Sequence, residues 1–271
     1  MPDDKSLDLL GIKPVADSVN RLTRAAVDGA SAFLSRICLP AAEELGLLFR
    51  DKVASWRARN AVLVVEHARD SLNDSGADTD ALSAHPRIVG QILELGSWSD
   101  GDEIQELWGG LLASSCTEDG RDESNLIFTN LLGQITSLQA RVITYSCEAA
   151  EKKVSAGGWV FAESLELDLA QVKRIAQVDD VYRLDRELDH LRALELMQGF
   201  DPDTQIADIT PTSLCLQFYM RCKGYRGSPV EFYNVKRSTA QVDTQVEPQV
   251  GEKGLKSGKQ KPSKRSRKIV K

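Results

Sequence analysis

The sequence lacks every residue pattern by which common enzyme sites are recognised. No Gly-rich loop is followed by the Lys-Ser/Thr pair of a nucleotide-binding loop, and no G-x-S-x-G elbow is present. Only three histidines occur, each isolated, so the H-E-x-x-H spacing of a zinc enzyme is absent. We therefore expect a protein that is not an enzyme, with no catalytic, cofactor-binding or metal-ligating residues. A carboxylate pair for acid–base chemistry or metal binding is left open, because sequence alone does not show which carboxylates the fold brings together.

Cysteine is scarce and unpaired. The five cysteines form no C-x-x-C motif and are odd in number, which argues against a zinc site and against a disulfide framework. A reduced cysteine within an apolar helical pattern behaves as a small hydrophobic residue. Cys38, Cys116 and Cys147 sit in or beside such patterns, so we expect structural thiols at these three positions, in a reducing cytoplasm. The other two cysteines are Cys215 and Cys222.

Long apolar runs are also missing. The most apolar early stretch, residues 25–49, is interrupted by four charged residues and falls short of the ~18 uncharged residues of a membrane span. Asp3, Asp4 and Asp8 stand where a secretory signal needs basic residues. The sequence therefore predicts a cytoplasmic protein without a transmembrane helix.

Charge is unevenly distributed along the chain. Residues 234–271 hold eleven basic and three acidic residues, a net +8, and since the whole chain carries −6, residues 1–233 carry −14. The 234–271 segment is poor in apolar residues, and we expect a disordered basic tail. The tail can contact nucleic acid or an anionic membrane by charge alone, or it can simply aid solubility. The candidate contacts are Lys261, Lys264, Arg265, Arg267, Lys268 and Lys271.

The first half of the chain predicts a multi-helix body. After a flexible lead-in at residues 1–13, apolar residues recur every three to four positions from Pro14 to Ile37, and Pro40 ends or kinks this helix. A longer helix follows over residues 41–72, and the polar run at residues 73–78 breaks it. We place the helical domain at residues 14–154.

The clearest helical period lies within residues 85–116. A short helix at 85–95 leads to a turn, and Asp100 with Glu103 is a credible N-terminal cap for the next helix. That helix carries a one-sided apolar stripe and contains the pair Gly109-Gly110, which costs roughly 1 kcal/mol per glycine relative to alanine. We expect the pair to mark a close helix crossing or a hinge. The stripe consists of Ile104, Leu107, Trp108, Leu111 and Leu112.

The pattern changes after Gly157-Gly158. Helices are expected at 138–154, 163–175, 179–198 and 211–222, with a short β-hairpin turning at Asp201-Pro202-Asp203. This order is typical of a winged-helix-like module, which we place at residues 155–233. Residues 179–196 hold six acidic residues against three arginines, so the helix favours protein contact over DNA contact. The acidic run itself is predicted to be a solvated face.

Three segments resemble the abortive-infection alpha family of bacterial phage-defence proteins. They are the turn into a helix at residues 39–46, the Trp56-Arg57-Ala58-Arg59-Asn60 continuation, and the helix–turn–helix from Pro86 to Ala113. The resemblance covers residues 39–140, but Gly109-Gly110 and His85 depart from the family's pattern. It implies a role in stopping phage propagation at the cost of the infected cell, and it supplies no catalytic residues.

Taken together, we expect a mainly α protein with a winged-helix-like C-terminal module, a short hairpin and a disordered basic tail. The first functional hypothesis is a non-enzymatic abortive-infection protein that binds a phage or host protein. The alternative is a winged-helix regulator that binds nucleic acid with help from its basic tail. A third, weaker hypothesis is docking on the inner membrane through residues 14–49 and the tail.

Overall fold

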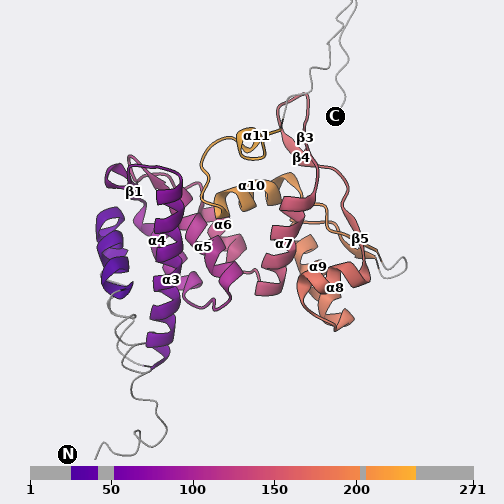
Figure 1. Cartoon of the computed structure of the whole chain (residues 1–271), viewed down its shortest axis with the longest axis horizontal. Coiled ribbons are helices and arrows are strands. Elements are labelled where there is room, and N and C mark those ends of the chain that lie inside the picture. Colours follow the sequence, from indigo (N-terminus) through magenta and orange to yellow (C-terminus); the bar gives the residue numbers. More distant parts are fainter. Residues whose placement is uncertain (1–25, 42–51, 202–205, 236–271) are drawn as a thin grey trace, which may run out of the picture. The chain divides into compact units, whose positions relative to one another are not determined.

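The computed structural model describes residues 26–41, 52–201 and 206–235 of the chain. Within them the fold is mainly helical, as the sequence predicted, with short antiparallel strands between the helices (Figure 1). The lead-in at residues 1–13 and all six basic residues named in the tail lie outside the described residues. Among the helices that are described, none is both long and apolar enough to cross a membrane.

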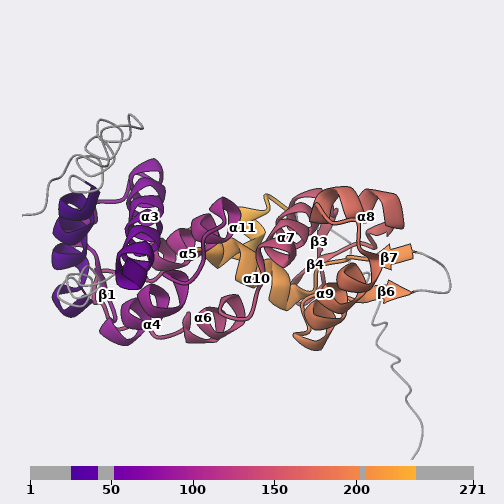
Figure 2. The ribbon, with the colours of Figure 1, turned by 90° about the horizontal axis from the view of Figure 1, so that it is seen from below.

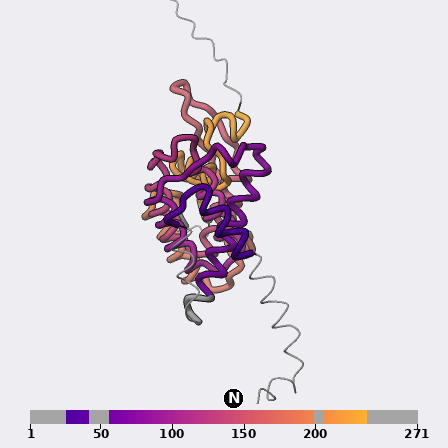
Figure 3. The backbone as a smooth tube through the Cα atoms, turned by 90° about the vertical axis from the view of Figure 1, so that its left-hand side faces the viewer, coloured from indigo at the N-terminus to yellow at the C-terminus, as the bar shows by residue number. Residues whose placement is uncertain are grey.

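The first described helices pack side by side. Residues 26–37 are helical and the helix is interrupted at Cys38, next to Pro40. They lie beside α3 (Lys52–Asp74), and the buried residues of both belong to one apolar core (Figures 1 and 3). α3 ends at the predicted polar turn, where Gly76 takes a left-handed backbone conformation that suits glycine.

The helices α4 (Pro86–Gly96) and α5 (Asp102–Ser114) confirm the two helices predicted in this region. The predicted cap at Asp100 is wrong, because α5 begins one residue later with Gly101 as its N-cap and without a side-chain cap. The Gly101 backbone lies so close to α7 that an added Cβ would be 2.7 Å from Ser137 Oγ. Two acidic residues in the first turn of α5 still favour its positive end.

Helix α5 lies at the centre of the core. All five residues of the predicted apolar stripe are buried, and Trp108 is 1% exposed. α3, α4, α7 and α10 all pack against α5, and this surrounds the helix on most sides. The sequence predicted one buried face, whereas ten of its thirteen residues are buried.

A small two-stranded sheet ties the start of α4 to the end of α5. After the 3-10 turn η2 (Thr79–Ala81), β1 (Ser83–Ala84) pairs antiparallel with β2 (Cys116–Thr117). Two residues per strand carry too little pattern for a sequence-based prediction. The pairing closes the loop around α4 and α5 and holds both helices together.

Helices α6 (Leu126–Leu132) and α7 (Ser137–Ala149) follow, and α7 is shorter than predicted. The expectation that it continues to Val154 is wrong. Lys152–Val154 forms β3, which pairs antiparallel with β4 (Val160–Ala162). The predicted joint at Gly157-Gly158 is the tip of this hairpin, and Gly158 has φ +83°.

The next elements are β5 (Glu166–Asp168), α8 (Leu169–Ala176), α9 (Val181–Ala193), β6 (Gly199–Asp201) and β7 (Ile206–Asp208). The helix predicted at 163–175 is wrong in its first half, because β5 pairs with β7 there. The predicted hairpin is confirmed, since β6 pairs antiparallel with β7. The three strands form a sheet in the order β5-β7-β6.

The chain then returns to its middle. Helix α10 (Ser213–Cys222) packs against both α5 and α7, and the short α11 (Pro229–Phe232) follows it (Figures 1 and 2). The buried residues of α10 belong to the same apolar core as those of α3 and α9. The core is therefore continuous across residues 154–155, where the sequence predicted a domain boundary.

Candidate functional site

Helix α9 is the best-defined candidate for a functional surface. Asp180 begins it, and its carboxylate accepts hydrogen bonds from the backbone N–H groups of Tyr182 and Arg183 at 3.0 and 3.2 Å. Leu184, Leu188 and Leu191 recur at helical spacing and are fully buried. These residues fix one face of α9 in the core and leave the opposite face at the surface.

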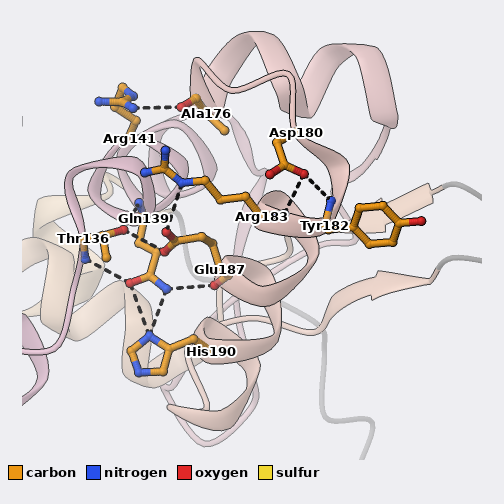
Figure 4. Close-up of polar contacts among 9 residues, drawn as sticks. All are labelled: Thr136, Gln139, Arg141, Ala176, Asp180, Tyr182, Arg183, Glu187 and His190. Carbon is orange, nitrogen blue, oxygen red and sulfur yellow. Dashed lines mark hydrogen bonds and ion pairs between the residues drawn. The ribbon is translucent and has the colours of Figure 1, made fainter.

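A polar cluster fastens α9 to the N-terminus of α7 (Figure 4). Thr136 caps α7, and its hydroxyl donates to Glu187 Oε2 at 2.8 Å. The Gln139 amide donates to the Glu187 carbonyl oxygen at 2.9 Å and lies 2.9 Å from His190 Nδ1. Gln139 is 1% exposed, so its two contacts are partly shielded from water, whereas the bond between Thr136 and Glu187 lies at the surface. We call Thr136, Gln139, Glu187 and His190 the α7–α9 clamp.

A second contact fastens the preceding helix α8. Arg141 on α7 donates from Nη2 to the carbonyl oxygen of Ala176 at 2.8 Å, at the C-terminal end of α8. The Arg141 guanidinium also lies 3.9 Å from Glu103 of α5. The positive charge favours the negative end of α8, and the hydrogen bond holds α8 on α7.

The outer face of α9 presents a tyrosine and two arginines. Tyr182 is 80% exposed, and in Figure 4 its ring points away from the clamp. Arg183 and Arg186 are exposed beside it, one and four positions further along the helix. Arg183 Nε lies 3.7 Å from Glu187 Oε1, which connects this surface to the clamp. We call Tyr182, Arg183 and Arg186 the α9 face.

The acidic residues of α9 have separate roles. Asp180 caps the helix, Asp189 pairs with Arg192 at 2.7 Å, and Glu187 bonds to α7. The prediction of a single solvated acidic face therefore does not hold for Glu187, whose side chain is 15% exposed. The negative net charge of residues 179–196 does not reveal that Arg183, Arg186 and Arg192 are all exposed.

The glycine pair lies at two close crossings. A Cβ on Gly109 would be 2.9 Å from the carbonyl oxygen of Val64 and would overlap His67 of α3. A Cβ on Gly110 would overlap the Cys222 carbonyl oxygen at the end of α10. Because both obstacles include backbone atoms, neither helix can move aside without disturbing the core. Gly109 therefore lies where α5 crosses α3, and Gly110 lies where α5 meets the end of α10. Neither glycine belongs to the α7–α9 clamp.

The described residues offer little reactive chemistry. They contain no group of three or more His, Cys, Asp or Glu side chains placed to hold a metal ion. All five cysteines are free and buried, and the sequence predicted a structural role for three of them, Cys38, Cys116 and Cys147. Burial raises the pKa of the Cys116 thiol to about 12, and burial also raises the pKa of Cys147 and Cys222. A protonated buried thiol is a poor nucleophile.

Sequence reasoning missed the exposed aromatic residues. Trp159, at the tip of the β3–β4 hairpin, is 67% exposed and borders a pocket of about 260 Å³ between β4, α10 and α11. Trp98 is half exposed and stacks against the Arg57 guanidinium at 4.3 Å. Tyr182 lies within the charged stretch 179–196, and nothing in the sequence marks it as exposed. Burial decides whether an aromatic residue is core or surface, and a single sequence does not report it.

Comparisons with known proteins identify the family. A family model described as abortive infection alpha matches residues 61–210, more than half of the chain. No curated protein and no solved structure matches the chain. The match begins later than the resemblance at residues 39–140 and extends further, so it includes the whole α7–α9 clamp and the α9 face. The chain therefore belongs to the abortive infection alpha family.

Proposed function

We propose that this chain acts in phage defence by binding a protein partner through the α9 face, without catalysing a reaction. The observation that carries the proposal is the 80% exposure of Tyr182 at the start of a helix that the core and the clamp hold in place. Membership of the abortive infection alpha family supports the defence role. The partner is a phage or host component, and its identity is left to the binding experiment.

The composition of the α9 face suits protein recognition. Tyrosine and arginine are enriched among the residues that dominate binding energy at interfaces, where truncating one of them typically costs about 2 kcal/mol or more. A helix that is already ordered loses little further backbone entropy on binding, so the contacts of its side chains contribute more to affinity. The clamp supplies that order before the partner arrives.

Charge also favours a protein over a nucleic acid. Residues 137–222 contain nine basic and fourteen acidic residues, a net −5. DNA binding depends on neutralising phosphates, and an acidic unit approaches them unfavourably. The two exposed arginines of the α9 face match a partner with acidic side chains better than a polyphosphate backbone.

Plaque counts on a host with and without the protein test the proposal. We expect fewer plaques with the wild-type chain, and restored plaques with the double variant Tyr182→Ala, Arg186→Ala at equal protein levels. Arg192→Ala is the matched control, because Arg192 is an exposed arginine of the same helix outside the α9 face. If the double variant protects the host as well as wild type does, the α9 face is not the contact surface. Unchanged plating by wild type across a broad phage panel counts against the defence role.

The order of elements favours a second candidate, a winged-helix unit that binds nucleic acid. Helices α8 and α9 are joined by the four residues 177–180, and the β6–β7 hairpin follows. The sheet order β5-β7-β6 supports the winged-helix prediction. In a winged-helix unit, α9 would be the recognition helix. Exposed Arg183, Arg186 and Arg192 would then face phosphate.

Salt-dependent binding to duplex DNA separates the two candidates. We expect weak binding that disappears when residues 234–271 are deleted and persists when Arg183, Arg186 and Arg192 are all changed to alanine. Such a result assigns any DNA contact to the basic tail. Tight binding that the triple alanine variant abolishes would favour the nucleic-acid regulator and contradict the protein-binding proposal.

A further inference from the structure

The orientation of the Gln139 side-chain amide is fixed by two backbone groups. Gln139 Oε1 accepts a hydrogen bond from the Thr136 backbone N–H at 3.0 Å, and a backbone N–H can only donate. Gln139 Nε2 donates to the Glu187 carbonyl oxygen at 2.9 Å, and a carbonyl oxygen can only accept. Exchanging the amide oxygen and nitrogen would set donor against donor and acceptor against acceptor. The amide nitrogen therefore has one orientation.

This orientation fixes the proton position on His190. Gln139 Nε2 has two hydrogens, and the one not bonded to Glu187 is available to His190 Nδ1, 2.9 Å away, whereas Gln139 Oε1 lies 3.4 Å from the same ring nitrogen and already accepts from Thr136. The shorter contact to the amide nitrogen makes His190 Nδ1 the acceptor, so it carries no proton of its own. A neutral ring then has its proton on Nε2. A ring protonated on Nδ1 would place a second donor against the amide.

The clamp leads directly to the exposed surface. Glu187 Oε2 accepts a hydrogen bond from the Thr136 hydroxyl, and Glu187 Oε1 lies 3.7 Å from Arg183 Nε. Arg183 belongs to the α9 face, and Arg186 and Tyr182 lie within one helical turn of it. A change at His190 that releases Gln139 therefore loosens the helix that presents all three residues.

We infer that His190 is a positioning residue for partner binding. As a neutral ring with its proton on Nε2, it accepts from Gln139 and holds the α9 face in its binding orientation. The positioning of the helix follows from the contacts alone, whereas its effect on binding rests on the proposed function. His190 touches no partner in this role, because it acts through Gln139 and Glu187.

The asparagine and leucine variants of His190 provide a matched pair. His190→Asn keeps an acceptor near the place of Nδ1, whereas His190→Leu fills the space and removes the acceptor. In His190→Leu one buried amide N–H of Gln139 loses its partner. We expect the backbone amides of α9 to exchange with solvent about tenfold faster in this variant than in wild type, and at nearly the wild-type rate in His190→Asn.

Nitrogen NMR of the ¹⁵N-histidine-labelled full chain at neutral pH tests the proton position. We expect the His190 signals to show an unprotonated Nδ1 and a protonated Nε2. A protonated Nδ1 overturns the inference, whatever the plaque assays show. Equal exchange rates of α9 in His190→Leu and wild type overturn the positioning role as well.

Plaque counts then separate this inference from the proposed function. We expect His190→Leu to lose protection and His190→Asn to keep it. If both NMR and exchange behave as expected but the double variant Tyr182→Ala, Arg186→Ala still protects, the proposed function fails and the positioning of α9 stands. If that double variant loses protection while His190→Leu keeps it, His190 is not needed to position the α9 face and the inference fails.

Discussion

At the scale of single residues, polar side chains decide where α9 lies. Tyr145 of α7 is 37% exposed, although its helical spacing from Leu138 and Val142 gives it a place in an apolar stripe. The residues that fasten α7 to α9 are Thr136 and Gln139, which form a capping box three positions apart. The Thr-x-x-Gln spacing was readable in the sequence as a helix start. The bonds from this capping box to Glu187 and His190 on α9 were not readable in the sequence, because the two segments are about fifty residues apart.

Changing Gln139 to leucine should weaken the fold measurably. The variant leaves the Thr136 N–H, the Glu187 carbonyl and His190 without their buried partner, so we expect the free energy of unfolding to fall by about 1–3 kcal/mol. Gln134→Leu is the control, because Gln134 is exposed and bonds only within its own turn; its effect should stay within ~0.5 kcal/mol. Urea unfolding of both variants measures the difference. Similar losses for the two would show that the clamp adds no stability.

The buried thiols predict how stability depends on pH. The Cys116 thiol is protonated in the folded chain up to a pKa of about 12, against an ordinary value of 9.0. An unfolded chain releases that proton near pH 9, so this contribution is complete below about pH 9 and is lost as the pH rises towards about 12. Over that interval one such group lowers the free energy of unfolding by about 1.4 kcal/mol per pH unit.

Urea unfolding at about pH 8 and about pH 10.5 measures this effect. We expect the wild-type chain to be less stable at the higher pH, and Cys116→Ala to lose less between the two conditions. The raised pKa of the buried Tyr219 acts in the same direction in both proteins, which makes the alanine variant the proper comparison. An identical pH dependence in the two proteins would contradict the burial of a protonated thiol at this position.

At the scale of elements, long helices were predictable and short strands were not. The stripe of α5 recurs at helical spacing from Ile104 to Leu112 and identifies a buried helix by its period alone. The strands β3 and β5 have three residues each, and their partners lie elsewhere in the chain. Lys152-Lys153-Val154 therefore read as the end of a helix. Pairing with β4 across the turn at Gly157-Gly158 overrode the local helical pattern.

Two glycines of the chain predict opposite effects of the same substitution. In Gly110→Ala the new methyl group meets the Cys222 carbonyl oxygen, so we expect a loss of about 1–3 kcal/mol in the free energy of unfolding. In Gly90→Ala the methyl group of α4 meets nothing within 4 Å, so helix propensity should raise stability by up to ~1 kcal/mol. Thermal unfolding measures both. A stabilised Gly110→Ala would mean that α5 and α10 do not cross closely there.

At the scale of the whole molecule, residues 1–233 and residues 234–271 carry opposite net charges. The sequence predicted the mainly helical class and the family from pattern and order. The packing of α10 against α5 and α7 was not predictable, because the apolar face of an amphipathic helix does not show which elements it packs against. The candidate site was not predictable for a related reason, because no residue type or spacing in the sequence marks which side chains of α9 are exposed.

The phage yield per infected cell tests the central claim most directly. One-step growth is measured in host cells that carry wild type, the Tyr182→Ala, Arg186→Ala double variant, or Arg192→Ala, at equal protein levels. If the α9 face binds the partner, wild type and Arg192→Ala both lower the yield, while the double variant returns it to the level of cells without the protein. A yield as low with the double variant as with wild type would contradict the role of the α9 face.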